Sequence, residues 1–320
     1  MDLHLLTENL SNPALLFFIL GVLAVRLGSD IEIPPSSSKF ISLYLLFAIG
    51  FKGGQELAHS HFGIDVLWSL VFGIGLAALI PLYCFFILRK KLGTDNAGAI
   101  AAAYGSVSAV TFVTGLSYLE SRGLQSSGHM VAIMALMEAP SILVGVILVR
   151  LYSGKNNGSP SFSHIIRHSF TNGSVFLIMG SIVIGFMSSD IQALGIKPFT
   201  TDLFKGFLAI FLLDMGISCG KKLNDFFRYG WFTLAFAIVI PLINGCAAAF
   251  ISCFITENIA DRLMFSLLAA SASYIAVPAA MKIAIPKANT GIYVPMALAV
   301  TFPFNITLGM PLYFYLCGGF

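Results

Sequence analysis

The chain has 320 residues, of which 57% are hydrophobic and only 10% are charged, and its formal net charge is +3. An average soluble domain has about 25% charged residues, and the 18 basic and 15 acidic side chains present here are too few to cover a water-soluble protein of this size. The composition therefore excludes a soluble enzyme, a nucleic-acid-binding protein and a disordered scaffold, and it predicts an integral membrane protein.

Long apolar runs, such as residues 66–88 and 231–255, predict membrane-spanning α-helices, because the strands of a β-barrel alternate in polarity over about ten residues. A span needs about 20 apolar residues, so the chain has room for ten. We expect them at about residues 13–28, 40–57, 64–88, 97–118, 128–152, 173–188, 201–220, 230–254, 262–283 and 291–316.

The basic residues are distributed unevenly over the connections between these spans. The side opposite to the N-terminus carries 13 of the 18 Lys and Arg residues. Because cytoplasmic loops are enriched in Lys and Arg, we expect that side to be cytoplasmic and both termini to be external. The Gly/Ser/Asn-rich stretch at 153–168 is then a cytoplasmic linker between two halves, residues 1–152 and 169–320.

The two halves repeat each other at an offset of about 160 residues. A GxxxG pair ends the second span of each half, at Gly50 and Gly54 and again at Gly216 and Gly220. Further matches follow in the same order, Pro81 with Pro241 and residues 106–108 with residues 271–273. Since each unit has five spans, an odd number, the second unit must enter the membrane from the other side. This predicts two inverted five-helix repeats, an architecture of secondary transporters.

The fourth and ninth spans have small and hydroxyl residues at their centres, residues 101–111 and 267–279. Gly105 permits unusual backbone angles and Pro278 removes a backbone donor, so both helices are predicted to be broken. The half-helix ends then present N–H groups to an anion and carbonyls to a cation. The alternative is that these serines only let helices pack closely.

Acidic residues inside apolar spans are costly and often functional. Glu138 in the fifth span and Asp214 in the seventh are candidates for cation coordination or a proton relay. The alternative is an acid paired with a nearby base, such as Lys52 for Asp214. Thr301 and Asn305 are further candidates, since they lie roughly where the second half corresponds to Glu138.

Enzyme motifs are missing from the sequence. No nucleophile–base pair is visible, and His59 and His61 have no third metal ligand nearby. We therefore expect no enzymatic activity, no cofactor, no transition-metal site and no nucleic-acid partner.

Residues 105–112 (GSVSAVTF), 118–122 (YLESR) and 136–140 (LMEAP), together with residues 269–289, resemble the two signatures of the sodium-dependent bicarbonate transporter superfamily. This resemblance implies a ten-helix inverted repeat with external termini that forms a homotrimer in the lipid of a bacterial inner membrane. It also implies import of bicarbonate with sodium as the coupling ion. A PII-type regulatory protein blocks some cyanobacterial members, although the linker here is much shorter than theirs.

The resemblance also implies roles for individual residues. The substrate-binding residues would be Gly105, Ser106, Val107, Ser108, Ser271, Ala272 and Ser273, and the sodium-binding residues would be Ser108, Thr111, Glu138 and Ser273. Two positions depart from the family pattern. Glu138 stands where the family usually has Asp, and Tyr274 replaces an Asp, which removes a carboxylate from the set of hard oxygen ligands.

Three functions remain open from the sequence. The first is a secondary transporter that imports a small anion, bicarbonate foremost. The second is a symporter of a small organic carboxylate, and the third is a membrane sensor that binds an anion without transporting it. Repeated halves with two broken helices favour alternating access over a sensor.

Overall fold

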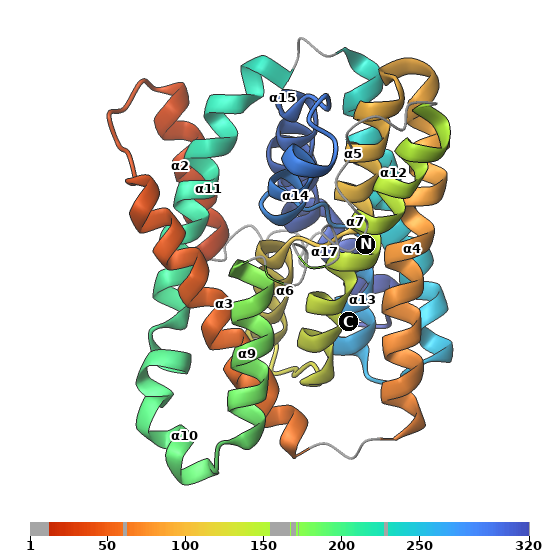
Figure 1. Cartoon of the computed structure of the whole chain (residues 1–320). Helices are drawn as coiled ribbons and strands as arrows, with labels where there is room; N and C mark the ends of the chain where they lie inside the picture. Colours follow the sequence, from red (N-terminus) through yellow and green to blue (C-terminus); the bar gives the residue numbers. More distant parts are fainter. Residues whose placement is uncertain are drawn as a thin grey trace.

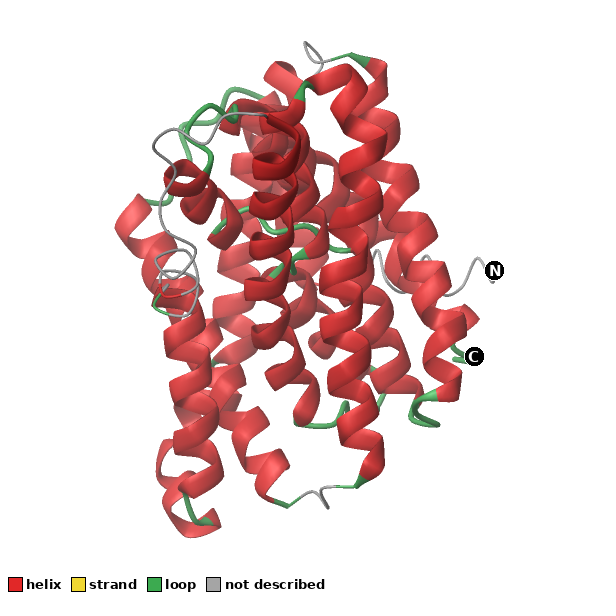
Figure 2. Ribbon diagram, turned by 45° about the vertical axis from the view of Figure 1, so that its right-hand side comes forward, coloured by secondary structure: helices red, strands yellow, loops and turns green. Residues whose placement is uncertain are grey.

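A computed structural model describes residues 13–59, 63–153, 167, 171, 173–226 and 230–319, except for the side chains of residues 14, 223–226 and 283. These residues form helices joined by loops, without a β-strand among them (Figures 1 and 2). The first half contains α2 (Pro13–Arg26), α3 (Pro35–Ala58), α4 (Ile64–Leu92), α5 (Thr94–Gly105), α6 (Ala109–Ser121) and α7 (His129–Ser153). The second half contains α9 (Gly173–Met187), α10 (Asp190–Lys197), η1 (Pro198–Asp202), α11 (Phe204–Phe226), α12 (Trp231–Ile251), η3 (Ser252–Phe254), α13 (Ile259–Ala270), α14 (Ala276–Ala284), α15 (Thr290–Pro295), η4 (Met296–Thr301), α16 (Phe302–Phe304), η5 (Asn305–Gly309) and α17 (Met310–Leu316).

The structure confirms an all-helical chain with membrane-spanning helices. Helix occupies each predicted segment, and within the described residues six helical stretches are long and apolar enough to cross a bilayer. They are Ile64–Leu92, Thr94–Ser121, His129–Ser153, Asp190–Lys222, Trp231–Phe254 and Thr290–Leu316. The helix α3 falls outside this set because polar residues interrupt its sequence, and α2, α9, α13 and α14 do so because each is short.

The short helix α10 is not predicted from the apolar runs. It begins after Ser189, whose side chain accepts from the Gln192 backbone N–H while the Gln192 side chain accepts from the Ser189 backbone N–H. This capping box satisfies two N–H groups at the helix start. The connection between α9 and α11 is therefore helical where we expect a loop.

The helices form two groups, and the first consists of α2, α3, α9, α10 and α11. In this group α3 packs on α9 with backbone against backbone. A Cβ atom on Gly54 would lie 2.1 Å from the Ile182 carbonyl oxygen, and one on Gly185 would lie 2.1 Å from the Phe51 carbonyl oxygen. Only glycine permits so close an approach.

The helices α2 and α11 pack in the same way. A Cβ atom on Gly216 would lie 2.1 Å from the Phe18 carbonyl oxygen, and one on Gly21 would lie 2.3 Å from the Leu213 carbonyl oxygen. The first predicted span of each half thus packs on the second predicted span of the other half, and the GxxxG glycines of both halves lie in these contacts.

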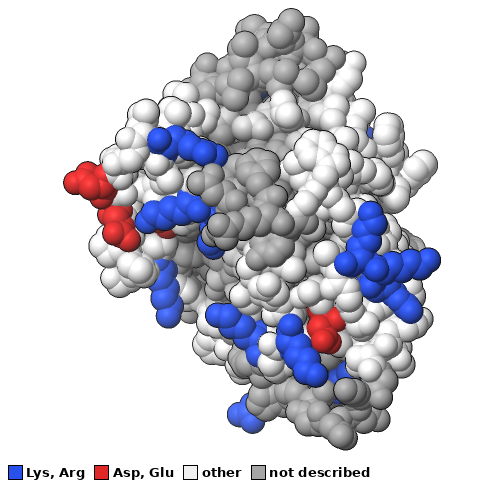
Figure 3. Space-filling model, turned by 90° about the horizontal axis from the view of Figure 1, so that it is seen from above, with Lys and Arg blue, Asp and Glu red and all other residues white. Residues whose placement is uncertain are grey.

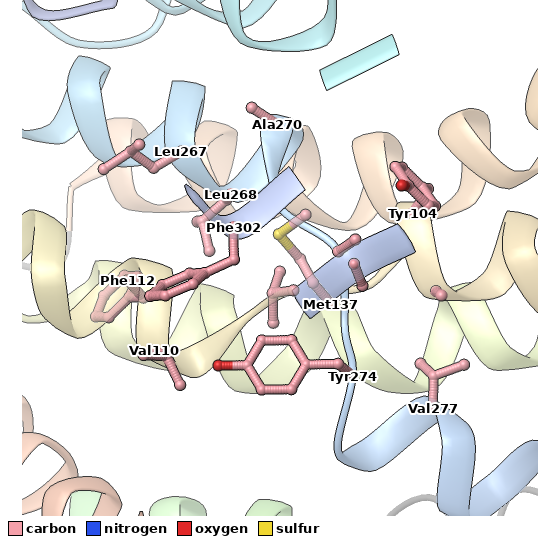
Figure 4. Packing of buried hydrophobic residues seen from close by; sticks show 14 of the residues in the cluster. Tyr104, Val110, Phe112, Met137, Leu267, Leu268, Ala270, Tyr274, Val277 and Phe302 are labelled. Carbon is pink, nitrogen blue, oxygen red and sulfur yellow. The ribbon is translucent and has the colours of Figure 1, made fainter. Parts of the chain in front are cut away.

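The second helix group contains α4 to α7 and α12 to α17. In this group α5 lies against α4 and α7, and a Cβ atom on Gly105 would lie 2.2 Å from the Pro81 Cγ atom. A continuous cluster of buried apolar side chains fills the space between the helices (Figure 4). Many large apolar side chains elsewhere remain exposed, such as Trp231 and Phe254, as expected for a surface in contact with lipid.

Basic side chains gather at the end of the molecule where α2 joins α3, α4 joins α5 and α11 joins α12. Figure 3 shows this end, on which Lys and Arg outnumber Asp and Glu. The charge asymmetry of the sequence is therefore present in the fold. Most of the predicted linker, 153–168, lies outside the described residues.

Replacing Gly54 with Ala should destabilise the protein, because the added methyl group forces α3 away from α9. Overpacking of this kind lowers the free energy of unfolding by about 1–3 kcal/mol. The matched control is Gly75→Ala in α4, where a Cβ atom meets nothing within 4 Å. We expect thermal unfolding in detergent to show a lower midpoint for Gly54→Ala and an unchanged or higher one for Gly75→Ala. Equal midpoints would contradict the close packing.

Candidate functional site

Two helices are interrupted deep inside the second group. Residues 106–108 separate α5 from α6, and residues 271–275 separate α13 from α14. The backbone is extended at both breaks, with φ −87° and ψ −175° at Ser106 and φ −83° and ψ 168° at Ser271. The helix α6 restarts because the Ser108 Oγ atom accepts from the Thr111 backbone N–H at 3.2 Å, which is an N-cap. Both interruptions lie in the segments where the sequence predicts them.

The two breaks contact each other directly. The Ser108 backbone N–H donates to the Ser271 Oγ atom at 3.0 Å, and the Ser273 backbone N–H donates to the Ala103 carbonyl oxygen at 2.8 Å. The Ser271 hydroxyl in turn donates to the Leu268 carbonyl oxygen at 3.1 Å. Segments more than 160 residues apart therefore satisfy each other's polar groups where neither has a helical partner.

Side chains satisfy the carbonyl ends of α5 and α13. The Ser141 hydroxyl donates to the Ala102 carbonyl oxygen at 2.6 Å. The Asn305 Nδ2 atom donates to the Ala270 carbonyl oxygen at 2.7 Å, and Asn305 is itself buried. These bonds hold the C-terminal ends of both half-helices away from solvent.

The opposite ends, the N-termini of α6 and α14, border a cavity of about 640 Å³. It lies between the two helix groups, with α3, α9 and α11 on one side and the breaks, α6, α7 and α14 on the other. We call it the central cavity. Its lining consists of Ser42, Leu45, Leu46, Val107, Ser108, Ala109, Val110, Val113, Met134, Ala135, Glu138, Ser174, Val175, Ile178, Phe211, Ser273, Tyr274, Ile275 and Ala276.

Five of the residues singled out from the sequence line this cavity, namely Val107, Ser108, Glu138, Ser273 and Tyr274. Five others, Gly105, Ser106, Thr111, Ser271 and Ala272, are buried beside it without lining it. In the described part of the chain, the hydroxyls of Ser106 and Thr111 have no hydrogen-bond partner.

Glu138 is the one charged residue in the described wall of the cavity. It lies on α7, and its Oε2 atom is buried without a hydrogen-bond partner among the described residues. A carboxylate in this position must be neutralised by a proton or a cation, because burying it alone is very costly. The cavity therefore contains a carboxylate that takes up either a proton or a cation.

Tyr274 lies in the wall of the cavity, beside the start of α6. Figure 4 shows its ring beside Val110, and the ring also packs against Phe302 with centroids 6.3 Å apart. The hydroxyl approaches Ser108 without the geometry of an ordinary hydrogen bond. A neutral phenol thus stands where the family signature has a carboxylate.

The remaining candidates lie away from the central cavity. Asp214 accepts a hydrogen bond from the Ser38 hydroxyl, and Lys52 pairs with Glu120 rather than with Asp214. Thr301 shares a hydrogen bond with the Tyr104 hydroxyl. Thr301 and Asn305 therefore connect helices next to the breaks.

Among the lining residues that sequence reasoning misses are Ser42, Ser174 and Phe211. They come from the helices α3, α9 and α11 of the first group, and they carry no motif. The only signal that points toward them is the reciprocal GxxxG packing, which brings α3 and α9 together.

Comparison with known families is informative. A family model described as Na⁺-dependent bicarbonate transporter superfamily matches residues 13–318, nearly the whole chain. Among curated proteins, no sequence matches.

Replacing Ser271 with Ala should destabilise the junction of the two breaks, because the buried Ser108 N–H loses its acceptor. An unsatisfied buried donor costs about 1–3 kcal/mol. The control is Ser266→Ala on the same helix, since the Ser266 hydroxyl bonds only to the Arg262 carbonyl one turn away and to the Cys317 Sγ atom at 3.9 Å. We expect the thermal midpoint in detergent to fall clearly more for Ser271→Ala. A larger fall for Ser266→Ala would count against the junction.

Proposed function

The chain belongs to the Na⁺-dependent bicarbonate transporter superfamily, and we propose that it is a secondary active transporter that imports a small anion, bicarbonate foremost, with sodium by alternating access. It is a membrane-spanning helical protein of a transporter family. The observation that carries the proposal is the central cavity, in which two half-helix N-termini and one acidic side chain meet.

The ends of α6 and α14 support anion binding. Each helix N-terminus has a partial positive charge of about half an elementary charge, and both border the same cavity. The hydroxyls of Ser108 and Ser273 line it as well, and the cavity wall contains no Lys or Arg within the described residues. The anion is held by backbone dipoles and hydroxyls, so the affinity is modest.

Glu138 supports coupling to a cation. Carboxylate and hydroxyl oxygens are the ligands that hard cations prefer, and Glu138, Ser108 and Ser273 lie in the wall of one cavity. A sodium ion beside Glu138 neutralises its charge and so removes the repulsion between this carboxylate and the transported anion. Thr111 adds a buried hydroxyl one turn into α6.

Alternating access requires two bodies that move relative to each other around a fixed site. The central cavity lies between the two helix groups, and the reciprocal packing of α3 on α9 and of α2 on α11 supports two inverted five-helix repeats. We extend the proposal to a homotrimer in a bacterial inner membrane, with both termini external and the 153–168 linker cytoplasmic.

One observation favours a second candidate, a small organic carboxylate. Most of the cavity wall is apolar, with Leu45, Leu46, Val113 and Phe211 among its residues, and Tyr274 adds an aromatic ring. An apolar wall suits an anion with a hydrocarbon body. Competition of acetate and propionate with labelled bicarbonate separates the two substrates.

Sodium-driven uptake should depend on Glu138. We expect proteoliposomes with the wild-type protein to take up labelled bicarbonate under an inward sodium gradient, and Glu138→Gln to lose this stimulation because the neutral amide no longer requires a cation. The control is Asp214→Asn, which removes the same charge from a residue that does not line the cavity. Size-exclusion chromatography verifies that both variants assemble. Unchanged sodium stimulation in Glu138→Gln would remove Glu138 from the cation site.

The size of the side chain at the half-helix ends provides a separate test. Ser108→Leu or Ser273→Leu should abolish uptake by filling the cavity, whereas the Ala variants should only weaken it, by about tenfold for each lost bond to the charged substrate. Initial uptake rates over a range of bicarbonate concentrations measure this difference. Full activity in the Leu variants would reject the central cavity as the substrate site.

A further inference from the structure

A second cavity, of about 650 Å³, lies between the same two helix groups, farther along α3, α6 and α7. We call it the outer cavity, since it lies toward the end of the molecule opposite to the basic face in Figure 3, which the proposed orientation makes external. Its lining consists of Ala48, Ile49, Lys52, Gly53, Glu56, Leu116, Glu120, Leu124, Gln125, Ser126, Ser127, Val131, Thr200, Thr201 and Phe204.

Ion pairs cross between the two helix groups at this cavity. The Glu120 Oε1 atom lies 2.6 Å from the Lys52 Nζ atom, and the Glu120 Oε2 atom lies 3.7 Å from the Lys205 Nζ atom. Lys52 belongs to α3 and Lys205 to α11, whereas Glu120 lies in the last turns of α6. One carboxylate of the second helix group is therefore held by two ammonium groups of the first.

The Glu120 carboxylate has the same planar O–C–O group as bicarbonate or an organic carboxylate. An anion that arrives in the outer cavity meets Lys52 as the nearest partner able to make a charge-assisted hydrogen bond. Glu120 already occupies that partner at 2.6 Å. The side chain and the anion therefore compete for one ammonium group.

When the anion replaces Glu120 on Lys52, each of the two lysines still faces one carboxylate-type group. Glu120 keeps Lys205 as a cation, and the other charged residue of the cavity wall within the described chain, Glu56, is unchanged. Asp261 lies behind the wall, where Ser126 and Ser127 bind its carboxylate. The exchange keeps both lysines paired, in contrast to simple opening of the ion pair, while it adds one negative charge to the wall that contains Glu56.

We propose that the outer cavity is a second binding site for the transported carboxylate-type anion, in which Lys52 binds the anion and the Glu120 carboxylate occupies Lys52 in its absence. This inference rests on the proposed function and adds a site to it. The helix α6 connects the two sites, because Ser108 at its start lines the central cavity and Glu120 near its end lines the outer cavity.

Concentration dependence of uptake separates this site from a merely structural ion pair. Loss of a charge-assisted bond in Lys52→Gln should raise the KM for external bicarbonate about tenfold. Glu120→Gln should lower it, because the competing carboxylate is gone. A structural ion pair predicts changes in the same direction for both variants, since each breaks the same contact, and that result would overturn the proposal.

Three further variants sharpen the experiment. The double variant Lys52→Gln/Glu120→Gln should have the same raised KM as Lys52→Gln. Removal of the competing Glu120 carboxylate lowers the KM only when Lys52 is present to bind the anion. Lys52→Arg keeps a cation and should keep a near wild-type KM, which shows that losses in Lys52→Gln do not come from misfolding. Lys197→Gln removes an exposed lysine at the same end of the molecule but outside the cavity wall, and its KM should not change. An equal rise in Lys197→Gln would attribute the effect to general surface charge.

A labelling experiment tests whether the outer cavity binds bicarbonate, without measuring transport. Thr201→Cys places a thiol in the wall of the outer cavity, in a background with Cys246 and Cys253 replaced by Ser. Bicarbonate should slow its reaction with a membrane-impermeant methanethiosulfonate, and Lys52→Gln should abolish that protection. If the wild-type protein takes up no bicarbonate, but bicarbonate still protects the Thr201→Cys thiol from labelling, the proposed transport function is wrong and the outer binding site is confirmed. Labelling that bicarbonate does not change overturns the site.

Discussion

A backbone polar group without a hydrogen-bond partner is the constraint on which this architecture depends. In the hydrocarbon core there is no water to satisfy an interrupted helix, so irregular backbone persists only where protein surrounds it. Here each break provides partners for the other, through Ser108 and Ser271 and through Ser273 and Ala103. Each interruption therefore depends on the other, and α5, α6, α13 and α14 must assemble as one unit.

The same constraint explains which polar residues border the central cavity and which only hold the fold. Asn305 and Ser141 satisfy carbonyls at the C-terminal ends of the half-helices, where the partial charge is negative. The N-terminal ends of α6 and α14 instead border a cavity. Ser108 and Ser273 combine both positions, because each hydroxyl accepts from a backbone N–H at the start of its helix and each residue lines the cavity.

Most of the fold is predictable from local sequence, because the apolar runs and the Ser-rich interruptions are themselves local features. Residues 106–108 and 271–273 were identifiable for that reason. The central cavity was predictable only in its second-group wall, where Ser108, Glu138 and Ser273 stand out chemically. Ser42, Ser174 and Phe211 are ordinary residues of their helices, and only tertiary packing brings them to the site. The partner of Lys52 was not predictable either, since Glu120 lies 68 residues away and no pattern connects the two.

The two cavities share the helices α3, α6, α7 and α11, and this arrangement limits how the molecule moves. The helix α3 lines the central cavity with Ser42, Leu45 and Leu46 and the outer cavity with Lys52 and Glu56. On α3 only Phe47 separates Leu46, the last residue that lines the central cavity, from Ala48, the first that lines the outer cavity. The close glycine contacts of α3 with α9 make these two helices move together. Separation of the two helix groups at the outer end therefore requires the ion pairs of Glu120 with Lys52 and with Lys205 to part.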